Sequence, residues 1–330
     1  MDLQQKTQRF GTAVILCVLC LRLLEAGLPG KLLNFLAQPN TTAFLFYIQT
    51  GRHVRFSASD GEFSPFFRES PPPWIPEPNK TQKNPKIPHF SQEEEGFVKI
   101  YNTSGKQYDL SALLQQPLRW NLRQDVPTVL ILHTHTTESY TKTQQSYQET
   151  SLYRTLDPGY NMLSIGEKVG NLLKNAGILT IHDQTLHDYP SYNGSYVHAR
   201  GSISEILAEN PSILLVLDLH RDASGGSGGQ LRPLAQVDGE TAAQMMLVMG
   251  TNHENWQQNL SLAVKLHALL EQQNPGIMRP INLRGQRFNQ DLSNGALLIE
   301  MGAAGNTHAE ALLAAEALAE AIIALANGTE

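Results

Sequence analysis

Cysteine is nearly absent from this chain of 330 residues. Its two cysteines, Cys17 and Cys20, lie in an apolar stretch near the N-terminus, and none follows them. The long C-terminal part therefore has no disulfide, and a metal site in it would have no thiolate ligand. Although the two cysteines have C-x-x-C spacing, no βαβ pattern surrounds them, so we interpret them as small apolar residues of that stretch.

A surplus of positive charge is missing as well. The chain has 25 Lys and Arg against 31 Asp and Glu, a formal net charge of -6, which argues against nucleic acid as a partner. No G-x-S-x-G nucleophile elbow, which would sit on a turn between a strand and a helix, supports a serine hydrolase. The glycine-rich stretch 225–229 lacks a Lys-Ser/Thr partner and does not open a helix, so we interpret it as a loop at the rim of a site rather than a phosphate cradle.

The N-terminus has the pattern of a targeting segment. Lys6 and Arg9 precede the apolar residues 10–21, and Leu23 and Leu24 follow Arg22. We predict an uncleaved signal anchor over residues 1–27, with a cleaved signal peptide as the alternative. Because positive charge before the segment keeps the N-terminus inside, we expect a protein of the cell membrane whose catalytic domain lies outside the cytoplasm.

The rest of the chain divides by composition. Residues 28–70 form a poorly defined membrane-proximal region, and the proline-rich residues 71–94 predict an extended linker. Residues 95–330 predict a catalytic domain in which helices and strands alternate. Strands are expected at 97–102, 128–132, 178–181, 213–219, 245–249 and 297–301, and helices at 161–174, 198–209, 256–273 and 308–325. This alternation indicates an α/β fold with a mostly parallel or mixed central sheet and helices on both faces.

Three apolar strands end in side chains that can bind a metal or carry a proton. The first is followed by His133, His135 and Glu138, the second contains Asp218 and is followed by His220, and the third has Glu300 next to its last residue. Polar residues at the carboxyl ends of parallel strands lie at one edge of a sheet. We therefore expect these groups, about 80 positions apart in sequence, to converge.

The residue types suit zinc, which binds imidazole nitrogen and carboxylate oxygen. His135 and Glu138 form a compact His-x-x-Glu pair, and His220 would be the third ligand, leaving one position open for water. Bound zinc lowers the pKa of water and polarises a carbonyl group. Glu300, held rigidly at the end of its strand, is the candidate general base.

Other nearby residues have weaker claims. His133 and Asp218 are expected to support the ligands, since strand alternation puts each on the same side as the ligand two positions later. Arg221 is expected either to bind a substrate carboxylate or to pair with Asp222. His253 is expected either to line the cleft or to cap the helix that follows it.

Several segments together resemble the stage II sporulation protein P family. The resemblance covers roughly residues 95–325, and its motifs are residues 133–140, 218–223, 249–252, 255–256, 289–293 and 298–302. It implies a zinc-dependent N-acetylmuramoyl-L-alanine amidase of exported type, with a fold similar to that of zinc amidases and metallocarboxypeptidases. Peptidoglycan would be the substrate, with further endopeptidase action on its cross-links. The role would be in sporulation engulfment, with stage II sporulation proteins D and M as partners.

By this resemblance, the chain binds one Zn²⁺ through His135 (or His133), Glu138 and His220, and Glu300 is the catalytic base. Asn252 and Asn289 enter as further residues of the matching motifs. In the broader amidase class the glutamate ligand precedes a helix, but the comparable place near residues 158–159 has no glutamate. Glu138 is then the natural substitute, and Glu149 and Glu167 stay open.

Two other functions compete with the amidase. One is a non-catalytic exported scaffold that binds wall or protein partners. The other is a membrane-anchored metallocarboxypeptidase, which would need an arginine for a free carboxylate, and Arg221, Arg284 or Arg287 could supply it.

Overall fold

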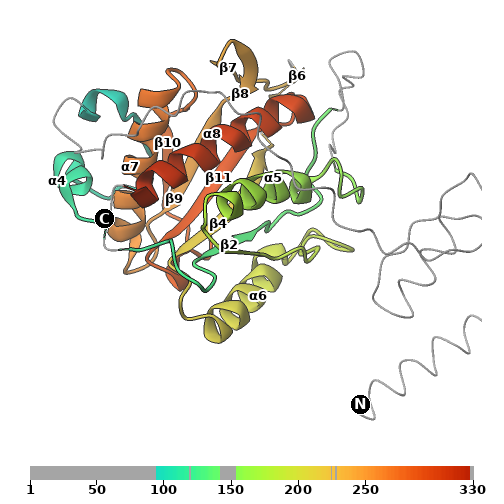
Figure 1. The fold of residues 1–330 in the computed structure, drawn as a ribbon. Helices are drawn as coiled ribbons and strands as arrows, with labels where there is room; N and C mark the ends of the chain where they lie inside the picture. The colour runs from blue at the N-terminus through green and yellow to red at the C-terminus, as the bar shows by residue number, and fades with distance from the viewer. Residues whose placement is uncertain (1–93, 119, 142–153, 224, 227–228, 328–330) are drawn as a thin grey trace, which may run out of the picture. The chain divides into compact units, whose positions relative to one another are not determined.

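The computed structural model describes residues 94–118, 120–141, 154–223, 225–226 and 229–327. All of them lie in the second of the two units into which the chain divides, Lys83–Glu330, so the fold below is that of one unit (Figure 1). The predicted anchor, the membrane-proximal region and nearly all of the predicted linker lie outside the described residues. Among the helices of the described part, none is both long and apolar enough to cross a bilayer.

The described elements follow one another in the order of this list: η1 (Glu94–Phe97), β1 (Ile100–Asn102), α4 (Leu110–Gln115), β2 (Val129–Leu132), α5 (Met162–Asn175), β3 (Thr180–His182), α6 (Ser195–Glu209), β4 (Leu215–Asp222), β5 (Gly225–Gly226), β6 (Gly229–Gln230), β7 (Leu234–Val237), β8 (Glu240–Ala243), β9 (Met245–Gly250), α7 (Trp256–Gln273), β10 (Ile281–Arg284), η3 (Gln290–Leu292), β11 (Ala296–Ala303) and α8 (His308–Asn327). The sequence pattern predicts the long helices and the apolar strands, and it does not predict β10, the β7–β8 hairpin or α4.

The central sheet has seven strands in the order β1-β10-β9-β11-β4-β2-β3. It consists of two parallel groups, β1-β10-β9 and β11-β4-β2-β3, which meet where β9 and β11 run antiparallel. The predicted α/β fold with a mixed sheet is therefore confirmed. Because β2, β4 and β11 are parallel neighbours, their carboxyl ends lie at the same edge, whereas the carboxyl end of β9 lies at the opposite edge.

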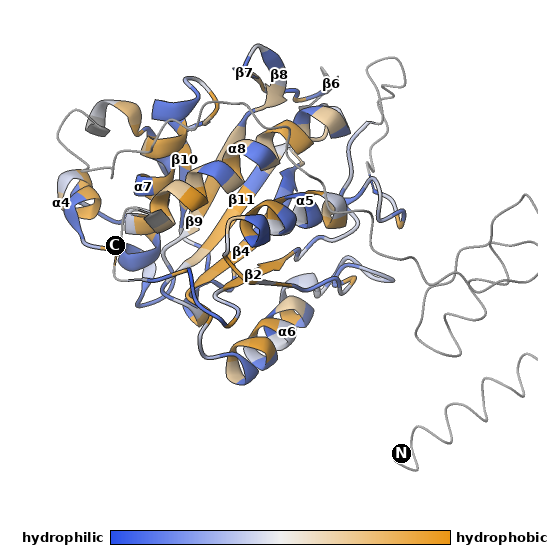
Figure 2. Cartoon of the chain, in the orientation of Figure 1, coloured by the Kyte–Doolittle hydropathy of each residue, from blue (hydrophilic) through white to orange (hydrophobic). Residues whose placement is uncertain are grey.

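Helices cover both faces of the sheet, but unequally. Alternate residues of β2 and β4, with β9 and β11, join a large core with α5, α7 and α8. The other side chains of β2 and β4 pack against Ala199 and Ile203 of α6 on the second face. On that face β9 and β11 contribute only Met246, Val248 and Leu298, packed with Phe288. Figure 2 shows the strands at the centre of the sheet as mostly hydrophobic, with polar residues on the outer sides of the helices.

The helix starts position residues that the site uses. At α5, Asn161 accepts a hydrogen bond from the Leu163 backbone N at 3.0 Å, which caps the helix as expected for an asparagine at this place. The predicted helix at 198–209 begins three residues earlier, at Ser195, after Gly194 with φ 90°. Glycine tolerates this left-handed conformation. The earlier start puts Ser195 and Tyr196 in the first turn of α6.

Candidate functional site

The three polar strand ends converge on one pocket of about 250 Å³. Its polar and aromatic lining comes from the segment after β2, from β4, from β11 and from the start of α6: His135, Glu138, Tyr192, Tyr196, His220, Arg221, Asp222 and Glu300. A larger hollow of about 740 Å³ lies at the opposite edge of the sheet, but its lining contains no charged or histidine side chain. The predicted residues His135, Glu138, His220 and Glu300 therefore line the smaller pocket.

His135 is the histidine of the first motif that lines the pocket. Its Nε2 lies 3.1 Å from the Tyr192 hydroxyl, and its Nδ1 lies 3.2 Å from Ser195 Oγ. The Tyr192 ring stacks on the His135 ring, with centroids 4.5 Å apart. Both oxygens are hydroxyls, which can donate or accept and can turn away. The imidazole is thus held in orientation by groups that can release its nitrogens.

His133 lies elsewhere, in the core between β2 and α5. Its Nδ1 is 3.0 Å from the Leu219 carbonyl oxygen, and its Nε2 is 2.9 Å from Nε2 of His182. Burial first, and then the neighbouring His182, lower the pKa of His133 to about 3. The expectation that His133 shares a face with His135 is wrong, because β2 ends at Leu132 and the alternation of a strand stops there.

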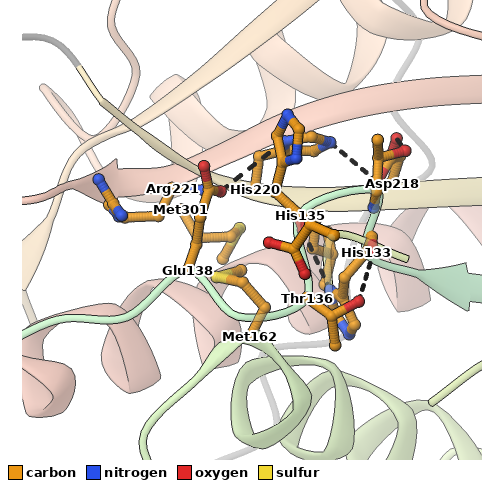
Figure 3. A network of polar contacts seen from close by, with 12 residues as sticks. His133, His135, Thr136, Glu138, Met162, Asp218, His220, Arg221 and Met301 are labelled. Carbon is orange, nitrogen blue, oxygen red and sulfur yellow. Dashed lines mark hydrogen bonds and ion pairs between the residues drawn. The ribbon is translucent and has the colours of Figure 1, made fainter. Parts of the chain in front are cut away.

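Glu138 is buried and held on several sides. Its Oε2 accepts a hydrogen bond from the Arg221 backbone N at 3.0 Å and lies 3.8 Å from His220 Nδ1 (Figure 3). Its Oε1 lies 3.4 Å from a guanidinium nitrogen of Arg154. Burial raises the pKa of Glu138, and the charges of Arg221, His220 and Arg154 oppose that rise. The carboxylate and the two imidazoles of His135 and His220 are thus neighbours.

Asp218, expected from the sequence to support the ligands, lies directly against His220. One Asp218 oxygen lies 2.9 Å from His220 Nε2, although the ring is not aligned for a hydrogen bond. Asp218 is fixed in turn by the Thr134 backbone N at 2.8 Å and the Thr134 hydroxyl at 2.7 Å. Burial lowers the pKa of His220, but Asp218, with Glu138 and Glu300, outweighs it and raises that pKa to about 9. The arrangement is a buried imidazole in a field of carboxylates.

Glu300 lies directly beside His220, since the two residues are paired in the β11–β4 register. Its Oε2 is buried and has no hydrogen-bond partner among the described residues. Burial raises the pKa of Glu300 to about 8, with His220 opposing and Glu138 reinforcing the rise. A carboxyl group with this pKa can both accept and donate a proton near neutral pH.

Three aromatic and basic residues of the site escape sequence reasoning. Tyr196 faces His220 from α6, with ring centroids 6.3 Å apart. Arg154 lies over the Tyr192 ring at 4.5 Å and forms an ion pair with Asp188. No motif identifies Tyr192 and Tyr196, because they precede or begin α6, whose sequence is polar. Arg154 comes from a different segment, which is joined to the site by a β-bridge with Glu138.

Of the remaining predicted residues, Asn289 supports the site and Asn252 and His253 lie away from it. Asn252 and His253 follow β9, whose carboxyl end lies at the opposite edge, so the structure does not bring them to the pocket. His253 is not the cap of α7 either, because that position is Asn255. Asn289 supports the site by donating a hydrogen bond to the Tyr196 carbonyl oxygen at 2.8 Å.

The structure also locates Arg221 and one of the two alternative glutamate ligands, Glu167. Arg221 lines the pocket, while Asp222, its suggested partner, accepts a hydrogen bond from Arg279 at 2.7 Å. Glu167 is exposed on α5 and does not line the pocket. Glu149 lies outside the described residues.

The donor set fits zinc by chemistry. His135, Glu138 and His220 supply two imidazoles and a carboxylate to one pocket, and the His220 nitrogen that faces Glu138 is Nδ1, since Asp218 lies against Nε2. Within the described ranges, however, no three such side chains are arranged closely enough to hold a metal ion. Binding an ion would therefore require side-chain movement, which the contacts of His135 with two hydroxyl groups allow.

The profile of the stage II sporulation protein P family matches residues 50–323. The chain belongs to this family. Stage II sporulation protein P of Bacillus subtilis (strain 168) is 29% identical over 207 residues, which are 59% of this chain and 50% of the relative. The match therefore spans about half the length of that relative.

Solved structures give a weaker likeness. The CwlD amidase from Clostridioides difficile in complex with the GerS lipoprotein is 15% identical, with a TM-score of 0.37, and the match covers 61% of this chain and 96% of that one. An N-acetylmuramoyl-L-alanine amidase from Clostridium difficile 630 is 18% identical, with a TM-score of 0.34 over 62% of this chain and 95% of that one.

Proposed function

We propose that this family member is a peptidoglycan hydrolase that cleaves the amide between N-acetylmuramic acid and the stem peptide in a zinc-dependent reaction. The observation that carries the proposal is the convergence of His135, Glu138, His220 and Glu300, from three parallel strand ends, on one pocket. Two imidazoles and a buried carboxylate form a ligand set, and a second carboxylate with a raised pKa forms a base.

His135, Glu138 and His220 would hold the zinc ion, which when bound supplies an activated water and polarises the amide carbonyl. Glu300 would take a proton from the attacking water at Oε2, the oxygen that no described group engages. It would then deliver that proton to the leaving amide nitrogen. Asp218 would keep the His220 ring in place throughout, because it is fixed by two hydrogen bonds from Thr134.

The wider setting is part of the same proposal. We place the protein at the cell membrane through residues 1–27, with the catalytic domain outside the cytoplasm and a role in sporulation engulfment. Stage II sporulation proteins D and M are the proposed partners, and action on peptide cross-links is a proposed second activity. The family name supports the sporulation role, and the charge pattern of residues 6–24 supports the anchor.

The test uses the full chain in detergent with purified peptidoglycan. We expect release of peptides with new amino termini, loss of that activity with a chelator and recovery with zinc. His220→Ala should be inactive, while His198→Ala, which changes an exposed histidine of α6 that does not line the pocket, should retain activity.

Each alternative outcome has a meaning. Full activity of His220→Ala would overturn the proposal. Release of free carboxyl-terminal amino acids would indicate a metallocarboxypeptidase, and binding of peptidoglycan without cleavage would indicate a scaffold.

A further inference from the structure

Tyr196 begins the face of α6 that covers the sheet. Ala199 and Ile203 pack against β2 and β4, and they follow Tyr196 by three and seven residues, which puts all three side chains on one side of the helix. At the first turn this side reaches His220, whose ring stacks on the Tyr196 ring with centroids 6.3 Å apart. The His135 ring meets Tyr196 edge-on, with centroids 5.6 Å apart. Tyr196 therefore contacts both histidines of the proposed ligand set.

The turn between β10 and β11 holds Tyr196 from the other side. Asn289 donates a hydrogen bond to the Tyr196 carbonyl oxygen at 2.8 Å, and the Phe288 and Tyr196 ring centroids lie 6.1 Å apart. One helical turn further along α6, Arg200 donates two hydrogen bonds to Asp291, at 2.9 and 2.8 Å. Phe288 and Asn289 have φ of 52° and 56°, in the left-handed region that residues other than glycine rarely adopt. Strain of this kind persists where the surroundings enforce it, and it concentrates at functional sites.

The hydroxyl group of Tyr196 is not used by the fold. The side chain is half-buried and lines the pocket, but its oxygen makes no hydrogen bond with any described residue. The Tyr192 hydroxyl, by contrast, lies 3.1 Å from His135 Nε2. Packing against His220 and Phe288 requires only the ring. A polar atom that the protein leaves unsatisfied at the wall of a pocket is available to water or to a ligand.

The carboxylates of the site lie close enough to act on this hydroxyl. Burial raises the pKa of Tyr196, and the charges of three carboxylates raise it further: those of Asp218, Glu300 and Glu138. The oxygen therefore lies toward the side of the pocket where Glu300 would meet the attacking water. Even at the ordinary pKa of about 10, a phenol keeps its proton near neutral pH, so this group can serve as a hydrogen-bond donor.

We propose that Tyr196 is a further catalytic residue, whose hydroxyl donates a hydrogen bond to the amide carbonyl oxygen as negative charge develops on it. The inference rests on the proposed function. As the water oxygen bonds to the carbonyl carbon, an electron pair moves onto the carbonyl oxygen and one water proton goes to Glu300. When the carbon–nitrogen bond breaks, that pair re-forms the carbonyl group and the nitrogen takes the proton from Glu300. The Tyr196 proton stays on its own oxygen throughout, and a donor held in place beforehand stabilises the transition state more than the ground state.

The test uses Tyr196→Phe in the full chain in detergent, with a synthetic muramyl peptide as substrate. We expect kcat to fall about 10²-fold with KM little changed, because the lost donor acts only as charge develops. Zinc affinity, measured by competition with a chelating dye, and the melting temperature should equal those of the wild type, since the ring and its contacts with His135 and His220 remain.

A phosphonamidate analogue of the substrate gives a second measurement without turnover. Its tetrahedral phosphorus carries a charged oxygen in place of the carbonyl oxygen, so Tyr196→Phe should raise its Kd by about the factor by which kcat/KM falls. Tyr189→Phe is the matched control. It removes the hydroxyl of an exposed tyrosine that precedes α6 and does not line the pocket, and it should leave kcat, KM and this Kd unchanged.

An unchanged kcat in Tyr196→Phe overturns the proposal. A lower kcat together with weaker zinc binding, or with an unchanged Kd of the analogue, overturns it as well, because Tyr196 would then only hold the histidines in place. If the wild-type protein does not cleave the muramyl peptide, the proposed function fails instead, and the analogue decides about Tyr196. Weaker binding of the analogue to Tyr196→Phe than to the wild type supports the donor, and equal or absent binding overturns it.

Discussion

His133 and His135 follow the same strand, but they lie in two different regions of the molecule. His133 is buried beside His182, and both of its ring nitrogens contact protein atoms: Nδ1 the Leu219 carbonyl oxygen and Nε2 the His182 ring. In the pocket, the two nitrogen atoms of His135 face only hydroxyl groups, and Glu300 Oε2 has no hydrogen-bond partner among the described residues. Both regions are well buried, so burial does not distinguish them. What distinguishes them is whether the protein itself satisfies the polar atoms, because an atom left unsatisfied by the fold is available to a ligand.

Among variants that compare the pocket with the buried histidine pair, Glu300→Gln in the pocket should have the largest effect, and that effect is on kcat. We expect kcat for peptidoglycan hydrolysis to fall roughly 10²- to 10⁴-fold, because the amide has the same shape but cannot accept the proton. Thermal unfolding should be unchanged or slightly shifted upward, since a buried carboxyl group without a partner is removed. If Glu300→Gln instead lowered the melting temperature markedly as well as kcat, Glu300 would have a structural role like that of His133.

The second test substitutes each of the two histidines that follow β2 in turn. His135→Gln should lower zinc affinity by more than about 100-fold, beyond the 10–100-fold typical of groups that only orient a ligand. His133→Gln should leave zinc affinity much less affected and lower the free energy of unfolding by about 1–3 kcal/mol, because buried polar partners are left unsatisfied. Competition with a chelating dye and denaturant unfolding measure the two effects, and a reversed pattern would make His133 the ligand.

A smaller effect is expected where α5 passes the buried pair. A Cβ on Gly166 would lie 2.5 Å from Nε2 of both His133 and His182. Gly166→Ala should therefore cost about 1–3 kcal/mol of stability through overpacking. Gly201→Ala is the matched control on α6, where an added Cβ meets nothing within 4 Å, and it should stabilise the protein by about 0.5–1 kcal/mol. Equal stabilities of the two variants would contradict the packing of this region.

The smallest expected effect is on how the free energy of unfolding depends on pH. Burial lowers the pKa of His182 to about 4, below the value near 6.5 of an unfolded chain. The unfolded state then binds more protons between these two values, so stability is full above pH 6.5 and falls as the pH drops toward 4. His182→Gln should lose less stability over that interval than the wild type does. Parallel curves of unfolding free energy against pH would show that this pair does not titrate on unfolding.

The sequence predicts which polar side chains converge on the pocket better than it predicts the aromatic walls. His135, Glu138, His220 and Glu300 follow from apolar strands that end in polar residues, a local pattern whose spatial meaning is given by parallel pairing. The misplacement of Asn252 and His253 has a topological cause, since a strand's direction in a mixed sheet depends on its neighbours and not on its own residues. Tyr192, Tyr196 and Phe288 could not be predicted, because they reach the pocket through the early start of α6 and through a strained turn that no local pattern marks.

The strand order also determines when such a site can exist. β4 pairs with β2 and β11, strands about 80 residues before and after it, and the pocket takes groups from all three. Contacts so distant in sequence form only after long segments have been brought together, which slows folding. A chain whose synthesis has not passed residue 303 therefore lacks the Glu300 wall and cannot complete the pocket. Activity of the proposed kind would begin only after β11 has joined β4, and a chain that stops before Glu300 would be inactive.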